Sequence, residues 1–131
     1  MKARAAKPEL ARIAIAVIMW FAAVATDFFW LAKVLGRPFP QTIPVSRTVY
    51  DAFAVPDIVM SLLLYAGAYG LVKARKYGYW ASLVGLGMWL FDVLLVLGIT
   101  GTSKLASVGP SFAFVVVSLT YLVMRGSHIL H

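Results

Sequence analysis

The sequence predicts an all-α integral membrane protein, an up-down bundle of four transmembrane helices that forms one domain over residues 1–131. The chain is 62% hydrophobic and 13% charged, whereas soluble domains are roughly 45–50% apolar and about 25% charged. Its apolar residues gather in four long stretches that prolines, glycines and charged residues separate. A water-soluble core of this size could not hide that much apolar surface, so we expect lipid to be the solvent for much of it.

Each of the four stretches is long enough to cross a bilayer, because a hydrocarbon core of about 30 Å takes roughly 20 residues of helix. They lie at about residues 11–35, 52–72, 79–99 and 107–124. The second is entered through Val55-Pro56-Asp57 and the fourth through Gly109-Pro110-Ser111.

The segments between these stretches do not continue the helices. Residues 36–44 contain three prolines, which remove backbone donors and fix φ. Residues 73–76 form a charged turn, and residues 98–104 form a turn rich in Gly, Thr and Ser. Because the connections are short, we expect consecutive helices to be antiparallel neighbours.

The distribution of basic residues predicts the orientation in the cell membrane. Eight fall on one side, namely Lys2, Arg4, Lys7, Arg12, Lys73, Arg75, Lys76 and Arg125, and four on the other, namely Lys33, Arg37, Arg47 and Lys104. The excess places both termini in the cytoplasm. Ala23-Val24-Ala25 resembles a signal-peptide cleavage site, but the apolar run continues to Leu35, longer than such a segment needs, so we expect the first helix to be retained.

Three of the five acidic residues, Asp27, Asp57 and Asp92, lie inside the apolar stretches; Glu9 and Asp51 lie outside or at the edge. A carboxylate in a membrane helix costs a few kcal/mol to insert, so it usually faces the protein interior. Each of the three lies a few residues outward of its helix centre, roughly 4–8 Å at the helical rise. They therefore form one layer in the outer half of the bilayer.

Helical spacing places polar and aromatic side chains beside these carboxylates. Aromatic rings next to carboxylates suit an organic or quaternary cation. The predicted proton- or substrate-binding residues are Asp27, Trp30, Asp57, Ser61, Tyr65, Trp89, Asp92 and Ser111.

Structural interpretations compete with this one. If the second helix begins at Pro56, Asp57 complements the positive end of the helix. Asp27 and Asp92 are in mid-helix, and their structural alternative is a protonated carboxyl or a pair with Lys33 or Lys104. Two further groups have structural interpretations, interfacial anchors at Trp30, Tyr50, Tyr77, Tyr79 and Trp80, and packing glycines at Gly67, Gly70, Gly85 and Gly87.

Several chemistries are not expected. The chain has no cysteine, and its two histidines, His128 and His131, are both in the C-terminal tail, so we predict no cofactor, no intramembrane metal site and no catalytic residue. Phosphate-binding and hydrolase motifs are absent from the sequence. The net charge of +7 is concentrated at helix ends and in loops, so we expect contact with anionic lipid and no nucleic-acid partner.

The size and four-helix plan resemble those of small multidrug transporters, whose signature glutamate in the first helix would correspond to Asp27 here. Acids among aromatic residues also resemble the four-helix sterol-isomerase and sigma-2-type membrane proteins. Both resemblances cover only a plan or a pattern of acids, so each implies a class of function and no motif.

Three hypotheses follow. The first is a small transporter or channel for a proton or small organic cation, working as a homo-oligomer in the lipid bilayer and using the intramembrane carboxylates. The second is a membrane-embedded enzyme or binder of a lipophilic ligand, with acid/base chemistry on a lipid or isoprenoid. The third is an accessory subunit of a membrane complex whose acids pair with a partner's basic residues.

Overall fold

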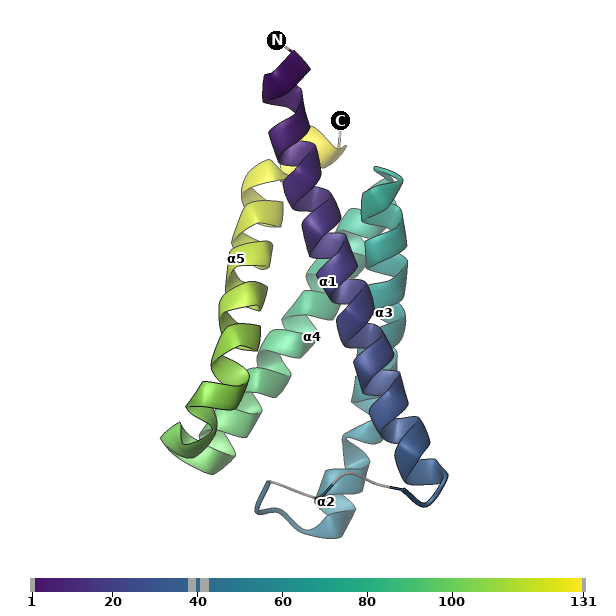
Figure 1. The fold of residues 1–131 in the computed structure, drawn as a ribbon, viewed down its shortest axis with the longest axis vertical. Helices are drawn as coiled ribbons and strands as arrows, with labels where there is room; N and C mark the ends of the chain where they lie inside the picture. Colours follow the sequence, from purple (N-terminus) through teal and green to yellow (C-terminus); the bar gives the residue numbers. More distant parts are fainter. Residues whose placement is uncertain (1, 38–39, 41–42, 131) are drawn as a thin grey trace.

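The computed structural model describes residues 2–37, 40 and 43–130, and these residues are folded entirely into helices and their connections (Figure 1). The elements are α1 (Lys2–Val34), α2 (Arg47–Ala52), α3 (Ala54–Val72), α4 (Lys76–Thr100), the 3₁₀-helix η1 (Gly101–Lys104) and α5 (Leu105–Leu130). The prediction of an all-α chain is confirmed for this part of the sequence.

The helices pack in series. The central helix α3 lies between α1 and α4, and α5 packs against α4. The beginning of α1 and the end of α5 lie at the same end of the molecule, and α2 lies at the opposite end (Figure 1). The largest side chains in the interior are almost wholly buried: Met19, Leu64, Leu71, Leu86 and Leu122.

Three helices begin earlier than their apolar stretches, and α1 and α5 are two of them. The helix predicted at 11–35 begins at Lys2, because the preceding residues include good helix formers that extend the first turns. The helix predicted at 107–124 begins at Leu105 and encloses Pro110, so the prediction that it begins through Gly109-Pro110-Ser111 is wrong. The short 3₁₀ turn η1 already reverses the chain, so α5 can begin before its proline.

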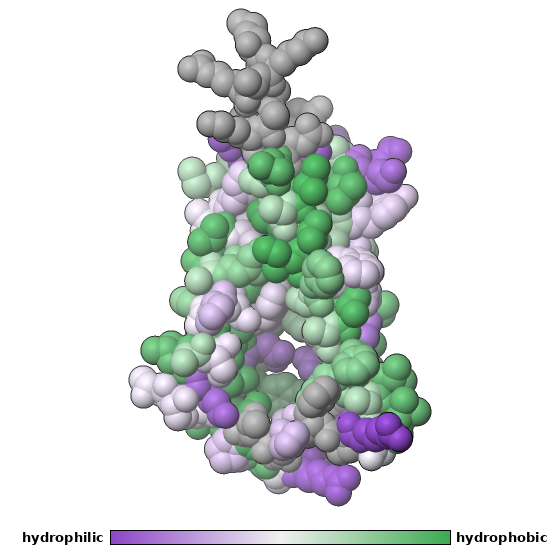
Figure 2. All heavy atoms as spheres, in the orientation of Figure 1, coloured by the Kyte–Doolittle hydropathy of each residue, from purple (hydrophilic) through white to green (hydrophobic). Residues whose placement is uncertain are grey.

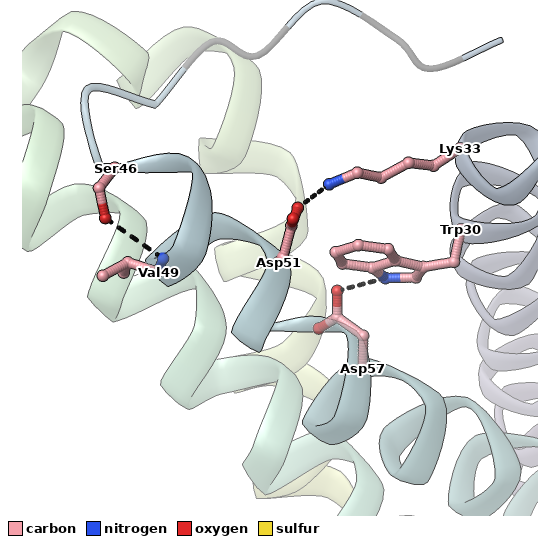
Figure 3. A network of polar contacts seen from close by, with 6 residues as sticks. All are labelled: Trp30, Lys33, Ser46, Val49, Asp51 and Asp57. Carbon is pink, nitrogen blue, oxygen red and sulfur yellow. Dashed lines mark hydrogen bonds and ion pairs between the residues drawn. The ribbon is translucent and has the colours of Figure 1, made fainter. Parts of the chain in front are cut away.

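The helix predicted at 52–72 corresponds to α3, which begins two residues later at Ala54, and a separate short helix, α2, precedes it with a break at Phe53. Pro56 explains the break, because its ring clashes with the carbonyl group four residues earlier, that of Ala52. Ser46 caps the start of the short helix α2, because its hydroxyl oxygen accepts a hydrogen bond from the Val49 amide at 3.3 Å (Figure 3). Of the predicted proline-rich loop at 36–44, positions 38, 39, 41 and 42 lie outside the described residues.

The predicted charged turn connects α3 to α4 and lies beside the closest helix contact of the molecule. Ala74 has a φ of 52° there, and α4 begins at Lys76, earlier than the predicted residue 79. A Cβ atom on Gly78 would collide with the backbone of Gly70, and one on Gly70 would collide with Gly78. Glycine at both positions therefore lets the two helices touch backbone to backbone.

Three stretches of helix are long and apolar enough to cross a membrane, Leu10–Val34, Arg47–Val72 and Lys76–Gly126. The third spans 51 residues and includes α4, η1 and α5. Large apolar side chains cover their outer faces, with Val117 67% and Phe91 65% exposed. Figure 2 shows hydrophobic residues across the middle of the molecule and hydrophilic residues gathered toward its ends.

Candidate functional site

The helices α3 and α4 touch at their connecting turn and separate toward α2, where an open cavity of about 570 Å³ lies between them. Two carboxyl groups, those of Asp57 and Asp92, line it. The rest of the wall is apolar or glycine: Val49, Ala52, Phe53, Pro56, Met60, Val84, Gly87, Met88, Phe91 and Leu95. The space-filling view shows the molecule hollowed in this same half, with hydrophilic residues inside the hollow (Figure 2).

Gly87 belongs to this wall and not to a packing contact. A Cβ atom built on Gly87 would meet nothing within 4 Å, whereas one on Gly85 would meet Leu64 Cδ2 at 3.1 Å. The interpretation of Gly85 as a packing glycine therefore fits the structure and that of Gly87 is wrong. The two positions are two residues apart and point to different sides of α4.

Asp57 is held from two sides. Its Oδ2 atom accepts a hydrogen bond from the indole Nε1 of Trp30 at 2.8 Å (Figure 3). Its carboxyl group also lies close enough to that of Asp92 for the two to interact electrostatically. Two neighbouring carboxyl groups repel each other when both are ionised, so a proton on either one relieves the repulsion.

Asp57 lies in the first turn of α3, as the helix-end interpretation expects. That interpretation placed Asp57 at the second helical position, whereas α3 begins at Ala54 and Asp57 is its fourth residue. Its carboxyl group bonds the Trp30 indole and interacts with Asp92 on two neighbouring helices. Complementing the end of α3 therefore does not account for all of its contacts.

Asp27 forms a second contact between α1 and α3. Its Oδ1 atom accepts a hydrogen bond from the buried Ser61 hydroxyl at 2.7 Å, and the same hydroxyl lies 2.9 Å from the Ile58 carbonyl oxygen. The Tyr65 hydroxyl, one turn further along α3, also interacts with the Asp27 carboxyl group. Asp27 thus has polar partners on α3 at two successive turns.

The structure brings six of the eight predicted residues into these linked contacts: Asp27, Trp30, Asp57, Ser61, Tyr65 and Asp92. Ser61 follows Asp57 by one helical turn, and Trp30 follows Asp27 by about one turn, so the two pairs are stacked along the contact of α1 with α3. All three aspartates predicted to form one layer are included.

The other two predicted residues lie elsewhere. Trp89 packs against Phe114 of α5, with ring centroids 5.5 Å apart. Ser111 is on α5, which packs against α4 and η1, and among the described residues no hydrogen bond joins it to the aspartates. Their helical spacing was compatible with the site, but both belong to the α4–α5 side.

Sequence reasoning placed Asp51 at the membrane edge and Tyr50 among the interfacial anchors, and missed their contact with α1. Lys33 forms an ion pair with Asp51 (Figure 3), and its ammonium group lies over the rings of Trp30 and Tyr50. Lys33 was considered as a partner of an intramembrane carboxylate, and its ion-pair partner is the edge residue. The spacing of Trp30 and Lys33, one turn apart, was the available signal.

Within the described residues, no group of three or more metal-ligating side chains could hold a metal ion. The site combines an apolar cavity, a pair of interacting carboxyl groups and aromatic rings with indole and phenol donors. No protein-family model matches the chain, and no curated protein or solved structure is significantly similar to it.

Proposed function

We propose that the protein spans the cell membrane four times, through α1, α3, α4 and α5. The third apolar stretch of 51 residues would be roughly 75 Å long as one straight helix, more than twice the hydrocarbon thickness. Its chain reverses at η1, so α4 and α5 form two crossings. The excess of lysine and arginine at the end shared by the start of α1 and the turn after α3 supports cytoplasmic termini.

We propose further that the protein transports a small organic cation in exchange for a proton. The observation that carries this proposal is the cavity beside α3 and α4, whose wall is apolar except for the interacting carboxyl groups of Asp57 and Asp92. Its volume of about 570 Å³ is in the range of small-molecule sites. An apolar cation gains from the wall, and its charge is compensated by the carboxylates.

The carboxyl pair also couples binding of the cation to release of the proton. When the cavity holds no cation, Asp57 and Asp92 share a proton, which avoids two negative charges in an apolar wall. An arriving cation stabilises both carboxylates and releases that proton. The hydrogen bond from Trp30 keeps Asp57 aimed at the cavity in either state.

A transport path between subunits of a homo-oligomer fits the serial packing. In the described residues, α5 packs against α4 and η1, and extensive contacts of α5 with α1 or α3 are absent. One copy therefore encloses little volume of its own. A second copy facing the cavity would close it away from lipid.

The experiment is uptake of tetraphenylphosphonium into proteoliposomes driven by a proton gradient, with protein-free liposomes as background. We expect Asp57→Asn and Asp92→Asn each to reduce proton-driven uptake at least tenfold, and Asp27→Asn to reduce it less because Asp27 is outside the cavity wall. Glu9→Gln is the matched control, since Glu9 precedes the apolar stretch. Uptake that is unchanged in both cavity variants would contradict the proposal.

A second function is favoured by the same carboxyl pair. Two carboxyl groups that differ in protonation can act as general acid and general base on a lipid or isoprenoid held in an apolar cavity. A lipid that co-purifies with wild type but not with the cavity-filling Gly87→Leu variant, and is converted on incubation, would support this enzyme activity. Co-purification of a stoichiometric membrane protein would instead favour the accessory-subunit hypothesis.

A further inference from the structure

The ammonium group of Lys33 occupies a cage of aromatic rings and a carboxylate. Its Nζ atom lies 4.9 Å from the centroid of the Tyr50 ring and 5.2 Å from that of Trp30. It also forms an ion pair with Asp51 (Figure 3). Distances below about 6 Å to two ring faces are those at which a cation is attracted by aromatic quadrupoles.

The walls of this cage are held independently of Lys33. The Trp30 side chain is 8% exposed, and its indole N–H is fixed by the hydrogen bond to Asp57. Phe29 packs edge-on against Trp30 at 5.1 Å and against Tyr50 at 6.3 Å. Removing the lysine would therefore leave two rings in place around an open position beside Asp51.

Lys33 also lies in the last turn of α1, where a positive charge complements the helix end. That role accounts for a basic residue at this position but not for two aromatic faces and a carboxylate from a separate helix, α2. An exposed ion pair contributes about 0–1 kcal/mol, and the lysine gives up rotamer freedom to form it. With Lys33 20% and Asp51 47% exposed, a cation from solution can reach the cage and compete.

We propose that the cage formed by Trp30, Tyr50 and Asp51 is a binding site for quaternary ammonium cations, and that Lys33 occupies it as an internal competitor. This inference rests on the proposed function, because it defines the class of cation admitted to the cavity. Trp30 connects the two sites, since its ring forms a wall of the cage while its N–H binds Asp57 of the cavity. A quaternary cation donates no hydrogen bond, so the aromatic ring faces are the groups that attract it.

The test is binding of tetraethylammonium to the purified full-length protein in detergent, measured by calorimetry. We expect Lys33→Gln to bind the probe roughly tenfold more tightly than wild type, because the competing ammonium is gone while the rings remain. Lys33→Arg keeps a cation in the cage and should bind as weakly as wild type. Lys104→Gln removes the same charge from η1, away from the cage, and should also match wild type.

Adding Tyr50→Ala or Asp51→Asn to the Lys33→Gln variant should abolish the gain, because each removes one wall of the cage. Equal affinity in wild type and Lys33→Gln would overturn the proposal, as would a gain that survives both second substitutions. If Lys33→Gln does not elute as a folded protein, amine acylation of wild type decides the question. Tetraethylammonium should increase acylation of Lys33 relative to Lys104, and unchanged acylation at saturating probe would overturn the proposal.

These outcomes separate the cage from the proposed transport. Loss of proton-driven uptake in Asp57→Asn and Asp92→Asn, without a gain of binding in Lys33→Gln, would leave transport standing and remove the cage. A gain of binding in Lys33→Gln, with no uptake by wild type, would leave the cage as a cation site and remove the proposed transport.

Discussion

The two ends of the α3–α4 pair differ in what lies between the helices. At the turn end, Gly70 and Gly78 bring backbone against backbone, and Gly67 lies so close to Ser82 that an added Cβ would approach the hydroxyl to 2.6 Å. At the other end, the same two helices separate around the cavity that holds Asp57 and Asp92. The glycines allow the close contact at the turn end. From there α3 and α4 diverge, and the space between them at the other end is the cavity lined by Asp57 and Asp92.

The first prediction concerns a substitution that disrupts the close contact of α3 with α4 at the turn end. Gly78→Ala should lower the free energy of unfolding by about 1–3 kcal/mol, because its Cβ collides with the backbone of Gly70, which cannot move aside as a flexible side chain could. Gly87→Ala is the matched control at the open end and should be neutral or stabilising by up to about 1 kcal/mol. Titration with SDS in mixed micelles measures both. Equal destabilisation would show that the two ends do not differ in packing.

The second prediction concerns a substitution that fills the cavity at the open end of α3 and α4. Gly87→Leu should weaken tetraphenylphosphonium binding roughly tenfold, because the leucine side chain takes space in the cavity without colliding with a neighbour. Gly98→Leu is matched to it, since Gly98 is also in α4 with nothing within 4 Å but does not line the cavity. Calorimetric titration of the two variants should separate them. Equal affinities would place the cation outside the cavity.

The third prediction concerns the hydrogen bond from Trp30 of α1 to Asp57, which joins α1 to α3 beside the cavity. Trp30→Phe should lower the free energy of unfolding by about 1 kcal/mol, because Asp57 loses the indole donor while the ring packing is largely kept. Trp80→Phe has the same chemistry at an exposed position, 56% accessible, and should change stability little. Comparable losses in the two variants would argue against a stabilising bond to Asp57.

The smallest expected effect is at the carboxylate of Asp27 on α1. Ser61→Ala should lower the free energy of unfolding by about 0.6 kcal/mol, the average of hydrogen bonds between membrane helices. Ser107→Ala is closely matched, because both hydroxyls lie near the carbonyl oxygen three residues earlier, at 2.9 and 3.0 Å, and only Ser61 also bonds Asp27. A loss no larger than that in Ser107→Ala would show that the Asp27 bond adds nothing measurable.

The sequence was sufficient to locate the long helices and most of the residues of the candidate site. Apolar length alone locates the membrane-length stretches, and Asp27, Asp57 and Asp92 make contacts among α1, α3 and α4. The short helix α2 was missed, because its residues include Arg47 and Asp51 and lie almost entirely before the apolar stretch. Hydropathy detects long apolar segments and does not detect a short helix that carries charged residues.

Which side chains contact one another depends on how the helices are arranged in space, and the sequence alone does not show that arrangement. Gly85 and Gly87 look alike as small residues, and only the splay of α3 from α4 decides which one packs. Trp89 shares a helical face with Asp92 by spacing, yet its ring packs against Phe114 because α5 lies beside it. The Lys33–Asp51 pair requires the chain to return after residues 36–44, and local spacing cannot predict where it returns.

The serial packing of α1, α3, α4 and α5 has a consequence for how the chain folds. The tightest contact, that of α3 with α4, is between helices joined by a short turn, and α5 adds to a helix that immediately precedes it. Most pairing is therefore local along the chain, which favours rapid folding. As synthesis proceeds from the N-terminus, α3 can pack against α1, then α4 against α3, and then α5 against α4. Assembly can follow the order of translation without rearranging helices that have already packed.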